Sequence, residues 1–410
     1  MKLTLTGVAA AIMMNISAIA GLNDPQLKIT PVGFLKMLLE NNAMTEVNNL
    51  SDIQAGQKRS IDIKYMQRGI ESEVSSVDDC DTPITAAWKT TSIGEPLFSK
   101  VGIFISDEDM RKYVTAATNP QALGNSAQSV SKALYETVLT YINALLQKID
   151  GNLVAAQALK FGVNAAYASA DAQSIALGTK AKMDDGVVKL VLDAEANEVY
   201  DELLICGNGL VRAFDVYNKL KSGTDANGFG ALDLKAYSDP KTVSGWGANH
   251  FGVFAKGTVG FVDCPQNVGI YAGEQGGSFF FQLPMPLPLS DGTILPLAFD
   301  CQLKYIDCPE KNGEGEIIAK RGWKLIISKT YGLFNLPSDC FKSGDPLYGV
   351  NGSFHYVATA QDDSVEVRNA AGTTLAVSQT AEAKVETPSN DAPAAGGEND
   401  PANGGAGGEG

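Results

Sequence analysis

Two histidines and six cysteines are the residues of this 410-residue chain with the greatest potential for nucleophilic chemistry. A thiol beside an imidazole can act as a nucleophile next to its base, so His250 or His355 could serve Cys264 or Cys340 in this way. A chain of this length also produces such a combination by chance. The motifs of nucleophile-elbow hydrolases, zinc proteases and phosphate-binding loops are all missing from the sequence. We therefore expect a protein without enzymatic activity.

The sequence also shows no pattern that would hold a metal ion or a cofactor. No two cysteines are spaced as C-x-x-C, and the presence of only two histidines argues against a structural zinc site. Asp78, Asp79 and Asp81 lack the ligand order of a calcium loop, and the acids at 107–109 are better explained by helix capping. Although an even number of cysteines permits disulfides, free thiols are the favoured interpretation. The cysteines are Cys80, Cys206, Cys264, Cys301, Cys308 and Cys340.

The balance of charge excludes one large class of function. The chain has 32 Lys and Arg against 47 Asp and Glu, which gives a formal net charge of -15. A protein that coats nucleic acid needs clustered basic residues, so this composition does not fit that role. It fits a protein that resists non-specific association at high concentration.

The first 21 residues, MKLTLTGVAAAIMMNISAIAG, leave two interpretations open. A charged start, an apolar run and small residues at 18 and 20 are typical of a secretory signal peptide. However, the segment has one basic residue, Asn15 and Ser17 interrupt the apolar run, and no lipobox cysteine follows Gly21. It is too short to span a bilayer, which takes about 20 apolar residues. We favour an apolar leading arm that packs against its own or a neighbouring subunit, with export as the alternative.

Several elements must position any functional surface. A short helix is predicted over 31–42, and the alternation in 59–69 predicts a strand. Turn-forming residues follow and strand-forming residues return, so residues 57–106 are expected to form a long β-hairpin or β-loop with a polar tip. A loop of this length is usually functional. Ser106 is a strong N-cap for a helix over 106–117.

The clearest element is an amphipathic helix over 126–149, where apolar residues recur every three or four positions. It needs a sheet or another helix along its whole length. A helix from 187, a buried strand at 203–209 and a helix ending near Gly223 follow, and they suggest a second sheet.

Strand-forming residues then occupy 251–307, 322–337 and two further stretches, 348–368 and 373–378. The prolines at 284, 286 and 288 exclude a central strand over that stretch. From about 381 the composition predicts a disordered tail.

The order of these elements resembles the major capsid proteins of tailed phages, the Hong Kong ninety-seven (HK97-like) fold. IDIKYMQRGIESEVSSVDDCDT and KVGIFISDEDMRKYV resemble its extended loop, and SAQSVSKALYETVLTYINALLQKIDGNL resembles its spine helix. DELLICGNGLVRAFDVYNKLK resembles the axial domain, and GWKLIISKTYGLFNLPSD resembles the returning strands. DDCD and GVNGSF are most similar to capsid proteins of phages that infect Bacteroidetes, including crAss-like phages. The resemblance covers about residues 30–357.

The resemblance implies an α+β chain with a defined division. It would comprise an N-terminal arm, an extended β-loop, a peripheral domain with the spine helix, an axial domain with return strands, C-terminal strands and an acidic tail. The corresponding ranges are 1–56, 57–106, 107–183, 184–345, 346–380 and 381–410.

The resemblance also implies the function. Copies would form hexamers and pentamers of an icosahedral head, meet scaffold and portal proteins, and enclose double-stranded DNA without sequence-specific contact, with no cofactor and no membrane. Assembly would take place in the host cytoplasm, and the protein would end in the virion. The extended loop would overlap a neighbouring subunit. The loop residues expected at that interface are Tyr65, Arg68, Asp78, Asp79, Asp81 and Trp88.

Two other functions stay open at this stage. A secreted or surface-exposed binding protein with a cleaved signal peptide would fit the first 21 residues and the even cysteine count. An encapsulin-like shell would share the fold but enclose protein cargo.

Overall fold

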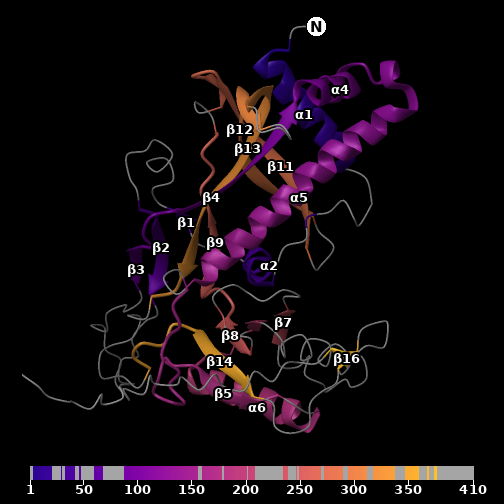
Figure 1. Cartoon of the computed structure of the whole chain (residues 1–410). Helices are drawn as coiled ribbons and strands as arrows, with labels where there is room; N and C mark the ends of the chain where they lie inside the picture. Colours follow the sequence, from indigo (N-terminus) through magenta and orange to yellow (C-terminus); the bar gives the residue numbers. More distant parts are fainter. Residues whose placement is uncertain are drawn as a thin grey trace, which may run out of the picture. The chain divides into compact units, whose positions relative to one another are not determined.

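A computed structural model gives the architecture of the chain (Figure 1). Two compact units are distinguished, Met1–Val377 and Ser378–Gly410, and every element below belongs to the first. The predicted tail at 381–410 lies outside the described residues. The structure describes residues 3–20, 29, 33–41, 46–47, 60–67, 87–155, 159–177, 180–200, 202–207, 234–238, 246, 249–268, 272–289, 294–311, 317–337, 347–359, 367–368 and 374–375.

The helices confirm most of the periodicity analysis. The predicted helices at 31–42, 106–117, 126–149 and from 187 are all present, and the long one continues to Val154. The apolar start of the chain is a further helix. The second helix predicted before Gly223 falls outside the described residues. The helices are α1 (Leu5–Ala20), α2 (Gly33–Glu40), α4 (Asp107–Thr118), the 3-10 helix η2 (Pro120–Ser126), α5 (Ala127–Val154) and α6 (Lys180–Ala196).

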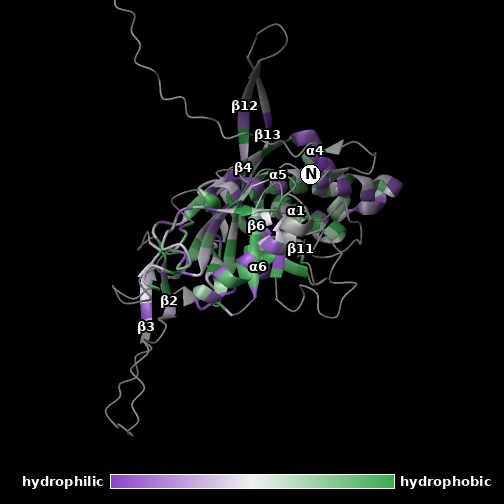
Figure 2. Cartoon of the chain, turned by 90° about the horizontal axis from the view of Figure 1, so that it is seen from below, coloured by the Kyte–Doolittle hydropathy of each residue, from purple (hydrophilic) through white to green (hydrophobic). Residues whose placement is uncertain are grey.

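The largest sheet is antiparallel and is assembled from strands far apart in the sequence. Its order is β10-β11-β12-β13-β4, and β9 pairs with the far end of β13. β12 and β13 lie side by side over most of their length (Figure 2). The strands are β4 (Leu97–Ser106), β9 (Val259–Asp263), β10 (Gly273–Gln275), β11 (Ser278–Pro288), β12 (Ile294–Lys311) and β13 (Ile317–Asn335).

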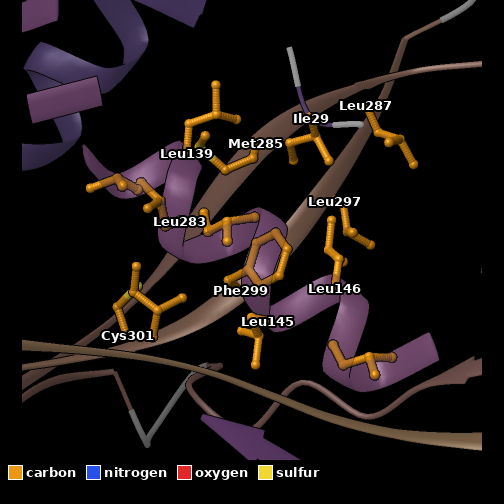
Figure 3. Close-up of a cluster of buried hydrophobic side chains, with 14 of the residues drawn as sticks. Ile29, Leu139, Leu145, Leu146, Leu283, Met285, Leu287, Leu297, Phe299 and Cys301 are labelled. Carbon is orange, nitrogen blue, oxygen red and sulfur yellow. The ribbon is translucent and has the colours of Figure 1, made fainter. Parts of the chain in front are cut away.

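Two helices cover one face of this sheet. α5 packs on β4 and β13, and α1 packs on β11 and β12. Along β11 the buried side chains alternate with more exposed ones, as period-two pleating requires: Phe281, Leu283, Met285 and Leu287 are buried. Figure 3 shows Leu145 and Leu146 of α5 beside Phe299 of β12 and Leu283 of β11. The expectation that a sheet or a helix lies along the long helix is thus confirmed.

The three prolines of β11 lie where the strand has a described neighbour on one side, namely β12. Pro284 and Pro286 pair with Ala298 and Pro296 of β12, whereas β10 pairs only with residues 278–280. Residues two apart present their backbone in the same direction, so all three missing N–H groups lie on one edge. The prediction that this stretch is not a central strand is confirmed.

Helix α1 is an integral part of the same core. Val8, Ile12, Ile16 and Ile19 are each at most 2% exposed and cluster with residues of α5 and β11. Residues 5–20 therefore pack against their own subunit. The sequence had left open whether this apolar arm packs on its own or on a neighbouring subunit.

Asn15 is the polar residue that interrupts the apolar run of α1. Its amide donates to the carbonyls of Ala11 (2.9 Å) and Tyr113 (2.8 Å), and its Oδ1 accepts from Ser131 Oγ (2.6 Å). A buried amide is costly unless it is hydrogen-bonded. Asn15 meets this condition and joins α1 to both α4 and α5.

The second sheet has its own core and the order β5-β14-β8-β6-β7. β6 lies between β8 and β7, and all five of its residues are buried: Leu204 and Cys206 belong to the core of the main sheet, and Leu203 and Ile205 to the core of the second sheet. The predicted buried strand is confirmed. α6 packs next to β5 at the edge of this sheet. The strands are β5 (Gln173–Ala176), β6 (Leu203–Gly207), β7 (Leu234–Ser238), β8 (His250–Ala255) and β14 (Ser353–Thr359).

Two small sheets complete the described strands. One has the order β1-β2-β3 and the other joins β15 to β16. Their strands are β1 (Glu46–Val47), β2 (Asp62–Gln67), β3 (Ala87–Ser92), β15 (Val367–Arg368) and β16 (Thr374–Leu375).

Candidate functional site

The predicted long loop begins and ends as a paired β-ribbon. β2 and β3 are antiparallel, with register from Asp62 opposite Ser92 to Gln67 opposite Ala87. At the base, Ile61 N donates to Gly94 O and Ile93 N donates to Ile61 O, both at 2.9 Å. The strand predicted in 59–69 and its antiparallel partner are confirmed. Residues 68–86, with the predicted polar tip, lie outside the described residues.

The base of this ribbon rests on β13 at Gly332. A Cβ atom at Gly332 would lie 2.8 Å from Ile61 Cδ1 and 3.1 Å from Ile93 Cδ1. Only glycine permits so close an approach, because any larger residue would require the isoleucines to move. Gly332 is therefore a point at which the base of the ribbon approaches the main sheet closely.

Two of the six predicted interface residues can be placed. Tyr65 is 7% exposed and packs in a small core of its own chain, whereas Trp88 is 61% exposed. Lys64 Nζ lies 5.3 Å from the centroid of the Trp88 ring, a cation–π contact on the ribbon surface. The core around Tyr65 consists of Ile61, Ile63, Val262, Cys264 and Phe334. Arg68, Asp78, Asp79 and Asp81 lie outside the described residues.

The acids at 107–109 act in the fold, as expected from capping. Ser106 Oγ accepts from Asp109 N at 3.1 Å, so Ser106 is the N-cap of α4. Asp107 also accepts from Trp323 Nε1 and Tyr305 Oη, each at 2.9 Å. The start of α4 is thereby tied to β13 and β12.

The two histidines contact each other. His250 Nδ1 and His355 Nε2 are 2.9 Å apart, and the His355 ring stacks on Phe161 with centroids 4.5 Å apart. Burial, and then the neighbouring His250, lower the pKa of His355 to about 4, and burial also lowers the pKa of His250. Both rings are therefore neutral near pH 7, with one donating its N–H to the other.

The cysteines whose side chains are described are buried free thiols, which was the favoured interpretation. These are Cys206, Cys264 and Cys301. Burial, assisted by Asp263, raises the pKa of Cys264 to about 12, and burial also raises the pKa of Cys301. A thiol that stays protonated is a poor nucleophile. The speculative Cys264–histidine pair thus lacks an activated thiol, and Cys340 lies outside the described residues.

One buried polar cluster was not found from the sequence. Lys329 is 2% exposed; its ammonium donates to Asp263 Oδ2 (2.6 Å) and Ala298 O (2.5 Å), and it lies over the Phe299 ring. Lys329 lies on β13 between the stretch that pairs with β12, which ends at Ser328, and the stretch that pairs with β9, which begins at Tyr331. Burial raises the pKa of Asp263 and Lys329 opposes that rise. The Asp263 side chain is 38% exposed, although its Oδ1 is buried without a partner among the described residues.

The described residues contain no group of three or more His, Cys, Asp or Glu side chains that could bind a metal ion. Within the same residues, no helix has the length and apolar character needed to cross a membrane. On the β2–β3 ribbon, Trp88 is exposed at the surface.

No protein-family model and no curated protein matches the chain. Among solved structures it is similar to a chain of the cyanophage A-1(L) capsid asymmetric unit, with 13% identity over 81% of this chain and 94% of that chain (TM-score 0.37). It is also similar to the capsid of cyanophage P-SCSP1u, with 12% identity over 83% of this chain and 92% of that chain (TM-score 0.35). A third similar structure is the capsid of Myoviridae phage XM1, with 11% identity over 79% of this chain and 92% of that chain (TM-score 0.34). These TM-scores describe partial likenesses.

Proposed function

We propose that the chain is the structural subunit of a tailed-phage head, a major capsid protein with the Hong Kong ninety-seven fold. In this proposal α5 is the spine helix, the β2–β3 ribbon is the base of the extended loop, and the second sheet belongs to the axial domain. Copies would assemble as hexamers and pentamers around double-stranded DNA. No catalytic step is assigned to the protein.

The observation that carries the proposal is the path of the chain between its two sheets. The ribbon leads into β4 of the main sheet, and α5 then crosses that sheet. The chain next builds β5 to β8 of the second sheet, returns through β9 to β13 to the main sheet, and then adds β14 to the second sheet. This is the loop, spine, axial and return-strand order that the sequence resemblance predicts.

Weak contacts are sufficient for such a shell. Each subunit in a closed assembly makes contacts with several neighbours, so modest interfaces add up to a stable particle. The net charge of -15 does not oppose this role, because an inner wall that repels DNA lets the packed genome move.

Electron microscopy of the purified full-length protein, with and without its scaffold protein, tests the proposal. We expect closed particles or capsomers of uniform size. Monomers under all conditions of salt and scaffold would refute it. The contents of purified particles separate the two shell functions, since protein cargo in place of DNA would identify an encapsulin-like compartment.

N-terminal sequencing of the protein from particles tests the secreted alternative. We expect the α1 residues to be present, because Val8, Ile12, Ile16 and Ile19 belong to the core. A chain that starts at Gly21 and carries paired cysteines would instead favour secretion.

A further inference from the structure

The two histidines of the chain meet on neighbouring strands of the second sheet (Figure 1). They are 105 residues apart in the sequence, and His250 lies on β8 whereas His355 lies on β14. In the antiparallel register His250 is opposite Val357, two residues from His355, so both side chains lie on one face as diagonal neighbours. The fold thus presents the two imidazoles as one unit, with His250 Nδ1 and His355 Nε2 2.9 Å apart.

Both rings are half-buried and have aromatic surroundings. His355 stacks on Phe161, and Phe161 in turn packs against Trp246 and Phe254. Within the described residues neither imidazole makes a further hydrogen bond or an ion pair. An imidazole has an ordinary pKa of about 6.5, so rings without an acidic partner are mainly neutral ligands above pH 7. The bond between the two rings is the polar contact that a ligand of this pair would replace.

The separation of the two nitrogens matches one kind of metal coordination. Two nitrogens that are each about 2.0–2.1 Å from an ion lie about 2.9 Å apart at adjacent corners of a square, and about 3.3 Å apart in a tetrahedron. The observed 2.9 Å fits the tetragonal geometry that Cu²⁺ and Ni²⁺ adopt better than it fits tetrahedral zinc. Of the divalent first-row ions, Cu²⁺ binds a given nitrogen site most tightly.

We propose that His250 Nδ1 and His355 Nε2 are two adjacent ligands of a Cu²⁺ ion whose other positions are taken by water. Binding breaks the hydrogen bond between the rings and turns them until both lone pairs point at the ion. Each neutral ring then holds its one proton on the outer nitrogen, His250 Nε2 or His355 Nδ1, so no proton is released. This open site differs from a closed zinc site with four protein ligands, which the sequence argues against.

The ion would join parts of the chain that belong to different cores. Phe161 follows α5 and packs with the core of the main sheet, whereas Phe354 and Tyr356 of β14 belong to the core of the second sheet. A ligand that fixes His355 also fixes its stacking on Phe161. Copper would therefore stabilise the contact between the second sheet and the segment that leaves α5. The inference goes beyond the capsid function and does not rest on it.

Electron paramagnetic resonance of the full-length protein tests the proposed ligands. The protein should carry no histidine tag, its accessible thiols should be blocked with N-ethylmaleimide, and one Cu²⁺ should be added per chain. We expect nitrogen splitting from two imidazoles, and these are assigned at once because the chain has only two histidines. His250→Gln and His355→Gln should each abolish the two-nitrogen spectrum. The matched control is Lys160→Gln, which introduces the same side chain at an exposed position beside Phe161 and should leave the spectrum unchanged.

Thermal unfolding measures the same site through stability. Free Cu²⁺ at about ten times its dissociation constant should raise the ratio of folded to unfolded protein about elevenfold, so the melting temperature rises. A chelator should reverse this rise. Both histidine variants should melt at the same temperature with and without copper, whereas Lys160→Gln should respond as the unmodified protein does.

Several outcomes would overturn the proposal. A copper spectrum that persists in both histidine variants would place the ion on other groups, and a two-nitrogen spectrum lost in only one variant would exclude the pair. A spectrum without imidazole nitrogen, or a stabilisation that needs a large excess of copper, would mean an adventitious ion only and leave the pair as a simple N–H···N hydrogen bond. If His355→Gln does not fold, His250→Gln provides the same test. Particle formation by the copper-free protein tests the capsid function separately.

Discussion

Replacing Ile12 with alanine should destabilise the subunit by about 3–4 kcal/mol. Ile12 is 0% exposed, in the middle of α1. The change removes three carbon atoms, worth about 2.4 kcal/mol at about 0.8 kcal/mol per buried methylene. The cavity that remains adds about another 1 kcal/mol, because a core that includes α5 and β11 collapses only partly around it.

Urea unfolding of the unassembled subunit, followed by circular dichroism, measures this loss. Met14→Ala is the matched control, since Met14 is on the same helix but 55% exposed, and its effect should stay below about 0.5 kcal/mol. Equal and small effects at both positions would refute the packing of α1 against its own core. Such a result would also revive the interpretation of the segment as a removable signal peptide.

Three further predictions concern the buried polar and close-packed positions. Lys329→Met should cost about 1–3 kcal/mol, because it removes the donor to the Ala298 carbonyl and to Asp263, whose side chain is 38% exposed and partly compensated by water. Denaturant unfolding should show a smaller loss for Lys329→Met/Asp263→Leu, and equal losses would contradict a charge-based role. The pKa of His355 is about 6.5 in the unfolded chain and about 4 in the folded protein, so its contribution to stability is complete above pH 6.5 and is lost as the pH falls toward 4. The variant His355→Gln should therefore lose less stability than the unmodified protein between pH 6.5 and pH 4. An unchanged dependence of stability on pH would argue against the buried histidine pair. Gly332→Ala should destabilise the ribbon base by about 1–3 kcal/mol, because the new Cβ would crowd Ile61 Cδ1. Adding Ile61→Val, which removes this Cδ1 methyl, should recover part of the lost stability in thermal unfolding. Absence of any recovery would show that the strain arises elsewhere.

Local pattern predicted the elements, and only the three-dimensional pairing revealed the polar sites. The stripe along α5, the Ser106 cap and the run of β6 are local signals, and each predicted its element correctly. Lys329 carried a weaker signal, since it occupies an inward position in the alternation Leu325, Ile327, Lys329. Its partners on β9 and β12 depend on pairings between distant segments, which no local pattern specifies.

The position of Lys304 directly opposite Lys324 could not be predicted from the sequence for the same reason. Each lysine alone is an ordinary solvent-facing residue of a strand. Their juxtaposition depends on the register of β12 against β13, and one residue of slip would move one of them to the other face.

The position of α1 at the start of the chain has a consequence for synthesis. Its partners α4, α5, β11 and β12 follow it on the ribosome, and β12 ends only at Lys311. At about 5–20 residues per second, roughly 290 residues take about 15–60 s to appear. The helical partners α4 and α5 are complete at Val154, whereas the strands on which α1 also packs follow only later. We therefore expect this apolar helix to be partly uncovered on the new chain until the strands of its core have been made.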